Sequence, residues 1–250
     1  MVTKIKKALA DFLSTYTLQE PRIVFFSGAG MSAESGISTF RDAGGLWEKH
    51  SIEEVATPQA FALDPEKVLS FYNQRRRQLL QCDPNPAHFA MARIARSFNT
   101  KVITQNVDDL HERAGSETVI HLHGELRKVR SSGNPQLIYE LDGWELKIGD
   151  CCEEGHQLRP HVVWFGEEVP MMEVAAAEVA SADLMVVVGT SLNVYPAAGL
   201  VDAPPAGVPR VIIDPADLGL GSQSDYFQIK ASASRGMQIL EDYLNESASV

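Results

Sequence analysis

The chain has 250 residues, of which 44% are hydrophobic, and it carries a formal net charge of −11. The length is that of one large domain or of one domain with an inserted lobe. The acidic charge repels polyanions and argues against nucleic acid or an anionic membrane as the partner. No stretch is apolar over a length that spans a bilayer, and three cysteines, two of them adjacent, do not make a disulfide framework. We therefore expect a cytoplasmic protein that is monomeric.

Along the chain, helix-like and strand-like segments alternate. The first 16 residues are basic at their start, but Asp11 and polar residues interrupt the apolar pattern, which predicts an amphipathic helix rather than a signal peptide. Short apolar runs that end in turn or cap residues predict strands at 22–27, 101–104, 119–121, 184–189 and 210–213. Continuous apolar strands are typical of a parallel sheet that is covered on both faces. The predicted fold class is α/β, with a Rossmann-like doubly wound parallel sheet.

Two stretches depart from this alternation. Residues 39–81 are predicted to form a loop and then helices, and residues 127–158 are polar and only weakly patterned. We interpret both as insertions that build a smaller lobe. The expected organisation is one domain over 1–250, with a core at about 1–38, 89–122 and 159–250 and a small lobe at about 39–88 and 123–158.

The stretch SGAGMSAESGISTFR, residues 27–41, follows the first predicted strand. Gly28 and Gly30 at the start of a helix allow backbone N–H groups to approach a pyrophosphate, with Ala33 as the third small residue. An ordinary tight strand–helix turn has the same pattern. An aromatic residue and an arginine further on, Phe40 and Arg41, favour a lid over a nucleotide.

Two more stretches place polar groups where strands end. In TQNVDDLHERAG, residues 104–115, Gln105, Asn106 and Asp108 emerge at the carboxyl end of a strand, where open α/β sheets bind ligands. Asn106 or Asp108 could instead simply cap a helix. In HLHGEL, residues 121–126, His123 ends a strand and suits general-base chemistry near neutral pH, although a single histidine is more often structural.

The last two stretches lie in the second half of the chain. RPHVVWFGE, residues 159–167, contains an apolar run that is either a core strand or an exposed edge that binds an extended peptide. In VVGTSLNVYPAAG, residues 187–199, a strand ends in Gly189, Thr190 and Ser191. These small and hydroxyl residues suit the second half of a dinucleotide crevice.

Taken in order, the five stretches resemble the sirtuin family of NAD-dependent protein deacylases, from about residue 22 to 231. The resemblance implies that NAD is consumed as a co-substrate and that His123 is the catalytic base, with Asn106 and Asp108 positioning the leaving nicotinamide. It implies that an extended acyl-lysine peptide is held by Val163, Phe165, Gly166 and Glu167, with Leu192 to Val194 opposite. The NAD site implied by the family comprises Gly28, Ala29, Gly30, Ser32, Ile37, Phe40, Arg41, Gln105, Asn106, Asp108, Gly189, Thr190, Ser191, Ala231 and Asp214, the last where the family usually has Asn.

The implied reaction begins with attack of the acyl oxygen on C1′ of the nicotinamide ribose, and nicotinamide leaves. His123 then removes a proton from a ribose hydroxyl, which attacks the imidate carbon. The products are lysine, nicotinamide and acyl-ADP-ribose.

The segment FYNQRRRQL, residues 71–79, carries three arginines in an acidic chain. Family members that prefer acidic acyl groups have a Tyr-x-x-Arg pair, which Tyr72 and Arg75 match, and a small pocket residue, which Ala56 matches. A guanidinium binds a terminal carboxylate bidentately, so the pair predicts a preference for succinyl, malonyl or glutaryl-lysine. The alternative is a surface ion pair of Arg75. Arg76 and Arg77 are expected on the solvated face.

Most sirtuins hold a structural zinc with two Cys-x-x-Cys pairs, and this chain departs from that pattern. The corresponding positions are Ser131, Asn134, Cys151 and Glu154, with Cys152 and His156 nearby. A structural site needs four ligands, mostly thiolate or imidazole. We therefore predict no metal, and we expect a hydrophobic cluster with Tyr139 and Trp144 to stabilise residues 137–148.

Other functions remain open at this stage. These are a plain lysine deacetylase, a mono-ADP-ribosyl transferase, and a non-catalytic sensor that binds NAD or ADP-ribose. The presence of His123, Asn106 and Asp108 together favours an enzyme, because a sensor does not need this set.

Overall fold

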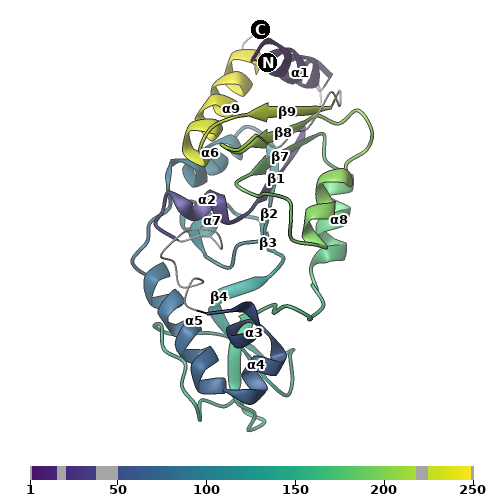
Figure 1. The fold of residues 1–250 in the computed structure, drawn as a ribbon. Coiled ribbons are helices and arrows are strands. Elements are labelled where there is room, and N and C mark those ends of the chain that lie inside the picture. The colour runs from purple at the N-terminus through teal and green to yellow at the C-terminus, as the bar shows by residue number, and fades with distance from the viewer. Residues whose placement is uncertain (1, 16–20, 38–49, 218–224, 249–250) are drawn as a thin grey trace.

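The computed structural model describes residues 2–15, 21–37, 50–217 and 225–248 (Figure 1). Its main feature is a six-stranded parallel sheet in the order β3-β2-β1-β7-β8-β9. This is the strand order of a Rossmann fold, and the direction of winding reverses between β1 and β7. The strands are β1 (Arg22–Ser27), β2 (Asn99–Thr104), β3 (Val119–His121), β7 (Leu184–Val188), β8 (Arg210–Ile213) and β9 (Tyr226–Ile229).

The predicted fold class and the five predicted strands are confirmed, with small shifts at their ends. The strand β9 was not predicted. Its sequence YFQI is short and contains a polar residue, and it lies at the edge of the sheet. Such a segment lacks the continuous apolar pattern of the central strands, of which β7 is buried along its whole length.

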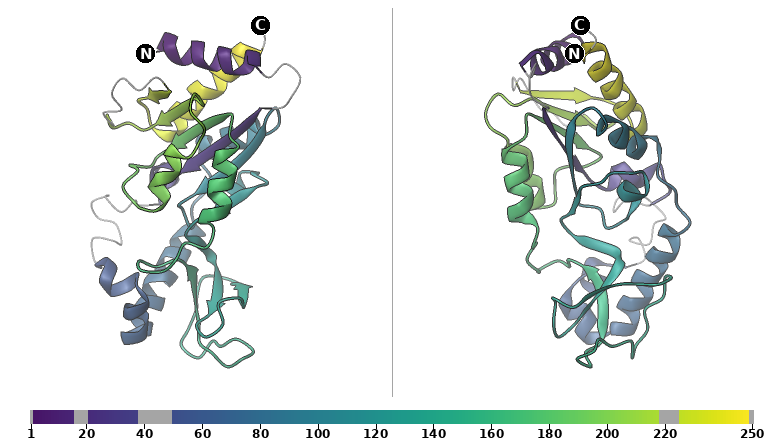
Figure 2. Two further views of the ribbon diagram at one scale, coloured as in Figure 1. Left: turned by 90° about the vertical axis from the view of Figure 1, so that its right-hand side faces the viewer. Right: turned by 180° about the vertical axis from the view of Figure 1, so that it is seen from behind.

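Helices cover both faces of this sheet, as the two views in Figure 2 show. On one face, α1 (Val2–Thr15), α6 (Pro86–Ile94) and α9 (Ala233–Ala248) bury apolar residues such as Leu9, Met91 and Leu240. On the other face, α8 (Met172–Ala180) and the 3-10 helix η2 (Ala197–Asp202) do the same with Val179 and Leu200. Two short helices, α2 (Ala29–Ala33) and α7 (Leu110–Arg113), follow β1 and β2. None of the helices, as far as the chain is described, is both long and apolar enough to cross a membrane.

The smaller lobe lies below the sheet in Figure 1 and has its own antiparallel sheet in the order β5-β4-β6. Its elements are α3 (Ile52–Val55), α4 (Pro58–Leu63), α5 (Pro65–Leu79), β4 (Gly124–Ser131), β5 (Ile138–Glu140) and β6 (Leu158–Val162). The Asp64 carboxylate accepts from the Lys67 N–H and caps α5, and Pro65 occupies its first turn. Neither β4 nor β5 was predicted, because their polar sequences carry little hydrophobic periodicity. The apolar run in residues 159–167 was considered as a strand, and the structure has β6 there, which ends at Val162.

The hydrophobic cluster expected in residues 137–148 is present in part. Leu146 is buried together with Leu69 and Val129, and Tyr139 packs against them. Trp144 was expected in this cluster, but it lies 36% exposed. The reason is that its backbone carbonyl faces inward and accepts a hydrogen bond from Arg76, while its ring lies beneath the exposed Arg77.

Candidate active site

The predicted crevice lies where β1 and β7 end, at the point where the winding of the sheet reverses. The Gly28 N–H donates to the Val188 carbonyl at 3.0 Å, and the Gly30 N–H donates to the Gly189 carbonyl at 2.8 Å. A Cβ on Gly30 would lie 2.8 Å from the Gly189 Cα, and Gly189 itself has a φ of +62°. The glycines therefore allow the ends of the two strands to touch. The N–H groups of Gly28 and Gly30 donate to carbonyls at the end of β7.

A buried polar network joins the end of β2 to α2. The Ser32 hydroxyl donates to the Asp108 carboxylate at 2.9 Å, and the Asn106 amide donates to Ser32 Oγ and to the Gly28 carbonyl, each at 3.1 Å. Burial raises the pKa of Asp108, against the hydrogen bond from Ser32. The Leu110 N–H, the first of α7, also donates to the Asp108 carboxylate at 3.3 Å, so Asp108 joins the start of this helix to the network.

His123 follows β3 and lies beside the same network. Its Nδ1 is 3.0 Å from the Gln105 carbonyl oxygen. This contact selects the tautomer in which Nδ1–H donates and Nε2 keeps its lone pair. Burial lowers the pKa of His123, so the ring is neutral at neutral pH and its Nε2 is free to accept a proton. The Gln105 side chain reaches the other half of the crevice, where its amide donates to Thr190 Oγ1 at 3.0 Å.

The neighbouring His121 is held in a different way. Its Nδ1 lies 3.0 Å from the Asn106 carbonyl oxygen, and its Nε2 lies 2.8 Å from a Glu112 carboxylate oxygen. Burial is the largest influence and lowers the pKa of His121, but the hydrogen bond and charge of Glu112, the Asn106 carbonyl and the charge of Glu125 together outweigh it, and the pKa ends above its usual value. Both ring nitrogens are occupied, so His121 fixes the backbone at Asn106, while His123 has the free nitrogen.

On α5, Tyr72 and Arg75 lie one turn apart. The Tyr72 side chain is 1% exposed, and its hydroxyl oxygen accepts a hydrogen bond from Trp164 Nε1 at 2.9 Å. The Arg75 guanidinium lies 5.7 Å from the centre of the Tyr72 ring. Burial lowers the pKa of Arg75, and the nearby Tyr72 and Asp108 act in the opposite direction. Ala56 is buried in the same cluster as Tyr72 and Trp164.

The expectation for Arg76 was wrong. It was placed on the solvated face with Arg77, but its side chain is fully buried. Its Nε and Nη1 donate to the carbonyls of Leu126 and Trp144, both at 2.9 Å, and burial lowers its pKa to about 10. The signal was present in the sequence, because Arg76 stands four residues after Tyr72 and therefore shares its helix face.

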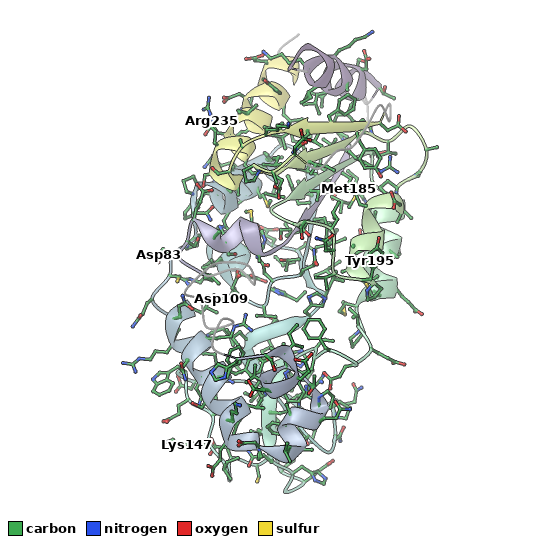
Figure 3. The ribbon with its side chains drawn as sticks, viewed as in Figure 1. Asp83, Asp109, Lys147, Met185, Tyr195 and Arg235 are labelled. Atoms are coloured by element: carbon green, nitrogen blue, oxygen red, sulfur yellow. The ribbon has the colours of Figure 1, made fainter. Side chains whose placement is uncertain are left out.

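The segment after β6 carries the predicted peptide contacts. β6 ends at Val162, and the N–H groups of Val163 and Phe165 then donate to the carbonyls of His123 and Ala56, at 2.9 and 3.0 Å. The Phe165 and Val194 side chains are each 42% exposed. Exposed apolar side chains of this kind suit contact with a peptide. The exposed Tyr195, next to Val194, is labelled in Figure 3.

Glu167 differs from its predicted neighbours. Its carboxylate forms ion pairs with Arg159 at 2.7 Å and Arg130 at 3.2 Å, and it accepts from the Trp164 N–H at 2.7 Å. These contacts pull the pKa of Glu167 below its usual value although burial opposes them. The side chain thus holds the segment in shape, and only its backbone is left for a peptide. Gly166, before it, has a φ of +88°.

The remaining predicted residues lie around the crevice. Asp214 ends β8, and its carboxylate accepts from the Ala216 N–H at 2.8 Å. Ile37 packs against the cluster around Tyr72, and Ala231 packs against the core of the sheet. Ala29 and Ser191 are half-buried. Phe40 and Arg41 lie outside the described residues.

Hydrogen bonds join side chains at and beside the expected zinc positions. The Cys152 thiol donates to the Ser131 hydroxyl at 3.3 Å, and the Asn134 amide donates to Glu154 at 3.1 Å. Cys151 is exposed. Hydroxyl, amide and carboxylate groups with one thiol do not fit a structural zinc. Within the described ranges, the group of three side chains that could share a metal lies elsewhere, at Glu112, His121 and Glu125.

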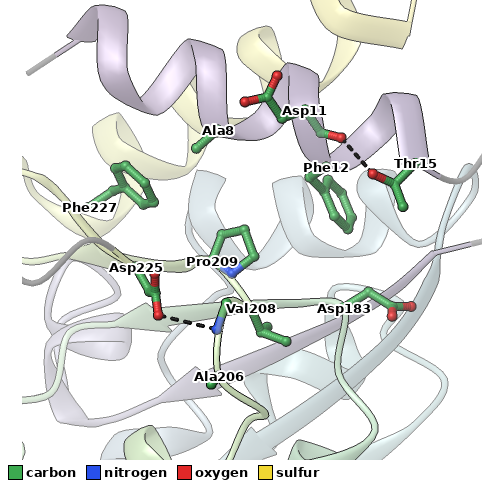
Figure 4. Close-up of a pocket in the computed structure, with 11 residues that line it drawn as sticks. Ala8, Asp11, Phe12, Thr15, Asp183, Ala206, Val208, Pro209, Asp225 and Phe227 are labelled. Carbon is green, nitrogen blue, oxygen red and sulfur yellow. Dashed lines mark hydrogen bonds between the residues drawn. The ribbon is translucent and has the colours of Figure 1, made fainter.

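A cavity of about 440 Å³ lies at the other edge of the sheet (Figure 4). Its lining includes Asp183, Pro209 and Asp225, which precede β7, β8 and β9, and residues of α1 such as Phe12. None of the predicted site residues lines it. Open α/β sheets bind ligands at the carboxyl ends of their strands, and this cavity lies at the amino ends.

The fold and the crevice define the class of this protein as a Rossmann-like α/β protein with an inserted lobe. Residues 28–196 match the model of the Sir2 family, so the chain belongs to the Sir2 family and is an enzyme of that family. An NAD-dependent protein deacylase of Bacteroides thetaiotaomicron is 52% identical over 227 residues, which cover 89% of this chain and 97% of the relative.

Solved structures agree with this assignment. A Sir2 homologue mutant in complex with ADP-ribose matches with a TM-score of 0.85 and 41% identity, covering 99% of this chain and 98% of the other. A Sir2 mutant with a deacetylated p53 peptide and 3′-O-acetyl-ADP-ribose matches with a TM-score of 0.75 and 28% identity, covering 94% and 97%.

Proposed function

We propose that this protein is an NAD-dependent protein-lysine deacylase that prefers succinyl, malonyl or glutaryl groups. The acyl group is transferred to ADP-ribose and nicotinamide is released. The observation that supports the acyl preference is the arrangement of Tyr72, which shares a buried cluster with Ala56, and Arg75, whose guanidinium lies 5.7 Å from the centre of the Tyr72 ring.

The network at the end of β2 supports the first chemical step. NAD supplies the ribose carbon that accepts the acyl oxygen and the nicotinamide that leaves. Asn106 and Asp108 lie buried and already fixed by Ser32, so they can hold the departing carboxamide without reorganising. A site of this kind also excludes water, which protects the reactive carbon from hydrolysis.

His123 supports the second step. Its Nε2 carries the free lone pair, because Nδ1 is occupied by the Gln105 carbonyl. Nε2 takes the proton of a ribose hydroxyl as that oxygen attacks the acyl carbon. The lysine amine departs in protonated form, and a water molecule adds to the resulting cyclic cation to give acyl-ADP-ribose. The lowered pKa of His123 keeps it in the unprotonated form that this step needs.

Recognition of an acidic acyl group would rest on the pair on α5. The Arg75 guanidinium offers two parallel donors to a carboxylate, and the Tyr72 hydroxyl offers a third. An acetyl group has no atom in this position. A hydrogen bond to a charged group contributes roughly 1.5–3 kcal/mol, which corresponds to about a tenfold to hundredfold preference.

The remaining elements of the proposal concern binding and architecture. The substrate is an acyl-lysine protein bound as an extended peptide between residues 163–167 and 192–194, with neither nucleic acid nor membrane as a partner. The protein acts as a monomer without zinc. One catalytic domain spans 1–250, with the core and small-lobe boundaries given above, except that β6 and Trp164 pack with the small lobe.

The test is NAD-dependent turnover of one lysine peptide in succinyl and acetyl forms, by the native chain, Arg75→Met and Arg77→Met. Arg77 is an exposed arginine on the same helix and serves as the matched control. Faster removal of succinyl, lost only in Arg75→Met, supports the proposal. Equal or acetyl-favoured turnover would leave a plain deacetylase. ADP-ribosylation of the peptide would show a transferase, and NAD binding without turnover would show a sensor.

A further inference from the structure

The contact between Trp164 and Tyr72 has a direction. Trp164 is 2% exposed and its Nε1–H donates to the Tyr72 oxygen at 2.9 Å. An indole nitrogen is only a donor, whereas a phenol oxygen can both accept and donate. Because Trp164 occupies an acceptor position of the Tyr72 oxygen, the proton of Tyr72 must point away from the indole.

That proton has no acceptor among the residues that the structure describes. Burial raises the pKa of Tyr72, so the phenol keeps its proton at neutral pH. A buried hydroxyl that is held by one bond and still carries a free donor is suited to an acceptor supplied by a ligand. On the same helix, the Arg75 guanidinium lies 5.7 Å from the centre of the Tyr72 ring, and its preferred ligand is also an acceptor.

The indole is itself held on several sides. The Arg159 guanidinium lies 3.3 Å from the centre of the Trp164 ring, and the Phe61 ring lies 5.4 Å from it on centres. Glu167 binds Arg159 and also accepts from the backbone N–H of Trp164. The direction of the indole N–H is therefore fixed before any ligand binds, which is what a positioning group requires.

We infer that Trp164 is a specificity-positioning residue, which aims the Tyr72 hydroxyl proton at the terminal carboxylate of the acyl group. The inference rests on the proposed function. Through it, the segment 163–167 that contacts the peptide also determines which acyl group is accepted. Arg75 binds the charged carboxylate, and the Trp164–Tyr72 pair supplies a hydrogen-bond donor in a fixed direction.

The first experiment measures kcat and KM of the native chain and of Trp164→Phe on one lysine peptide in three forms. These carry a succinyl group, its neutral amide analogue succinamyl, and an acetyl group. Phe keeps an aromatic ring but lacks the N–H. We expect KM to rise about tenfold more for the succinyl peptide than for the acetyl peptide, which corresponds to the loss of one charge-assisted hydrogen bond. Any change in the binding of the peptide backbone at residues 163–167 affects both peptides by the same factor. The rise in KM should be smaller for the succinamyl peptide, because its acyl group carries no charge.

Trp144→Phe is the matched control, since it makes the same substitution at a partly exposed tryptophan of the same lobe. It should change none of the three rates. Acetyl turnover reports whether each variant is folded and active. If Trp164→Phe lowers kcat/KM by the same factor for all three peptides, the role of Trp164 is purely structural and the inference is overturned.

A double-mutant cycle with Tyr72→Phe tests the route of the effect. If Trp164 acts through the Tyr72 hydroxyl, Trp164→Phe should cause no further loss of succinyl turnover once that hydroxyl is gone. Independent, multiplicative losses would overturn the inference. Failure of the proposed function looks different, because the native chain would then show no succinyl preference and no dependence on Arg75, and the inference would fail with it.

Discussion

The crevice and the small lobe are built by different means. In the crevice, backbone groups at the ends of neighbouring strands contact one another, as Gly28 and Gly30 do with β7. In the small lobe, side chains distant in the sequence carry the contacts, as in Trp164 with Tyr72 and Arg76 with the Leu126 carbonyl. The crevice therefore depends on close backbone contacts that leave no room for a Cβ, and the lobe depends on buried donors that need partners.

The largest effect should come from the base in the crevice. We expect His123→Ala to lower kcat for deacylation by about 10²–10⁴-fold, because a positioned general base contributes that much. Binding of NAD, followed by calorimetry, should be retained. Gln74→Ala, an exposed side chain on α5, is the control. Turnover by His123→Ala at the native rate would assign the base to another group.

In the small lobe, the largest loss of stability is expected from substitution of Arg76. Arg76→Met leaves the Leu126 and Trp144 carbonyls without their donor, and we expect the free energy of unfolding to fall by about 3–5 kcal/mol. Arg77→Met, one position further on the exposed face, should change it by less than about 0.5 kcal/mol. Urea denaturation measures both. Equal effects of the two variants would contradict the burial of Arg76.

In the crevice, the corresponding test of stability is the addition of one methyl group, at Gly189. A Cβ at Gly189 would lie 2.3 Å from the Met31 nitrogen, at a φ of +62°. Gly189→Ala should therefore cost about 2 kcal/mol or more of stability and weaken NAD binding. Gly199→Ala, where a Cβ meets nothing within 4 Å, is the matched control. Thermal unfolding and NAD titration distinguish the two variants.

This contrast explains what the sequence could and could not predict. In the crevice, each glycine directly follows an apolar strand in the sequence. This local pattern was enough to predict the strands β1, β2, β3, β7 and β8. The lobe depends on pairs such as Trp164 and Tyr72, separated by 92 residues, which no local pattern reveals. The burial of Arg76 was missed because charge was given more weight than helix position, although the four-residue spacing from Tyr72 was visible.

The buried histidines predict how the stability of the protein depends on pH. Burial lowers the pKa of His123, and it lowers that of His111 well below 6.5 and that of His88 to about 4. These histidines bind protons more readily in the unfolded chain than in the folded one. Protonation therefore favours unfolding, and the free energy of unfolding should fall as the pH drops below about 6.5. Unfolding at pH 7.5, 6 and 5 tests this expectation. His88→Gln should flatten the decrease.

The smallest effect is expected at the positions where the family holds zinc. The Ser131–Cys152 and Asn134–Glu154 hydrogen bonds join the same two chain segments that a metal would join. Incubation with a strong chelator should therefore leave the melting temperature unchanged. Ser131→Ala should lower stability by only about 1 kcal/mol, since it removes hydrogen bonds between neutral groups. A chelator-induced drop in the melting temperature, reversed by added zinc, would show that a bound metal stabilises the lobe.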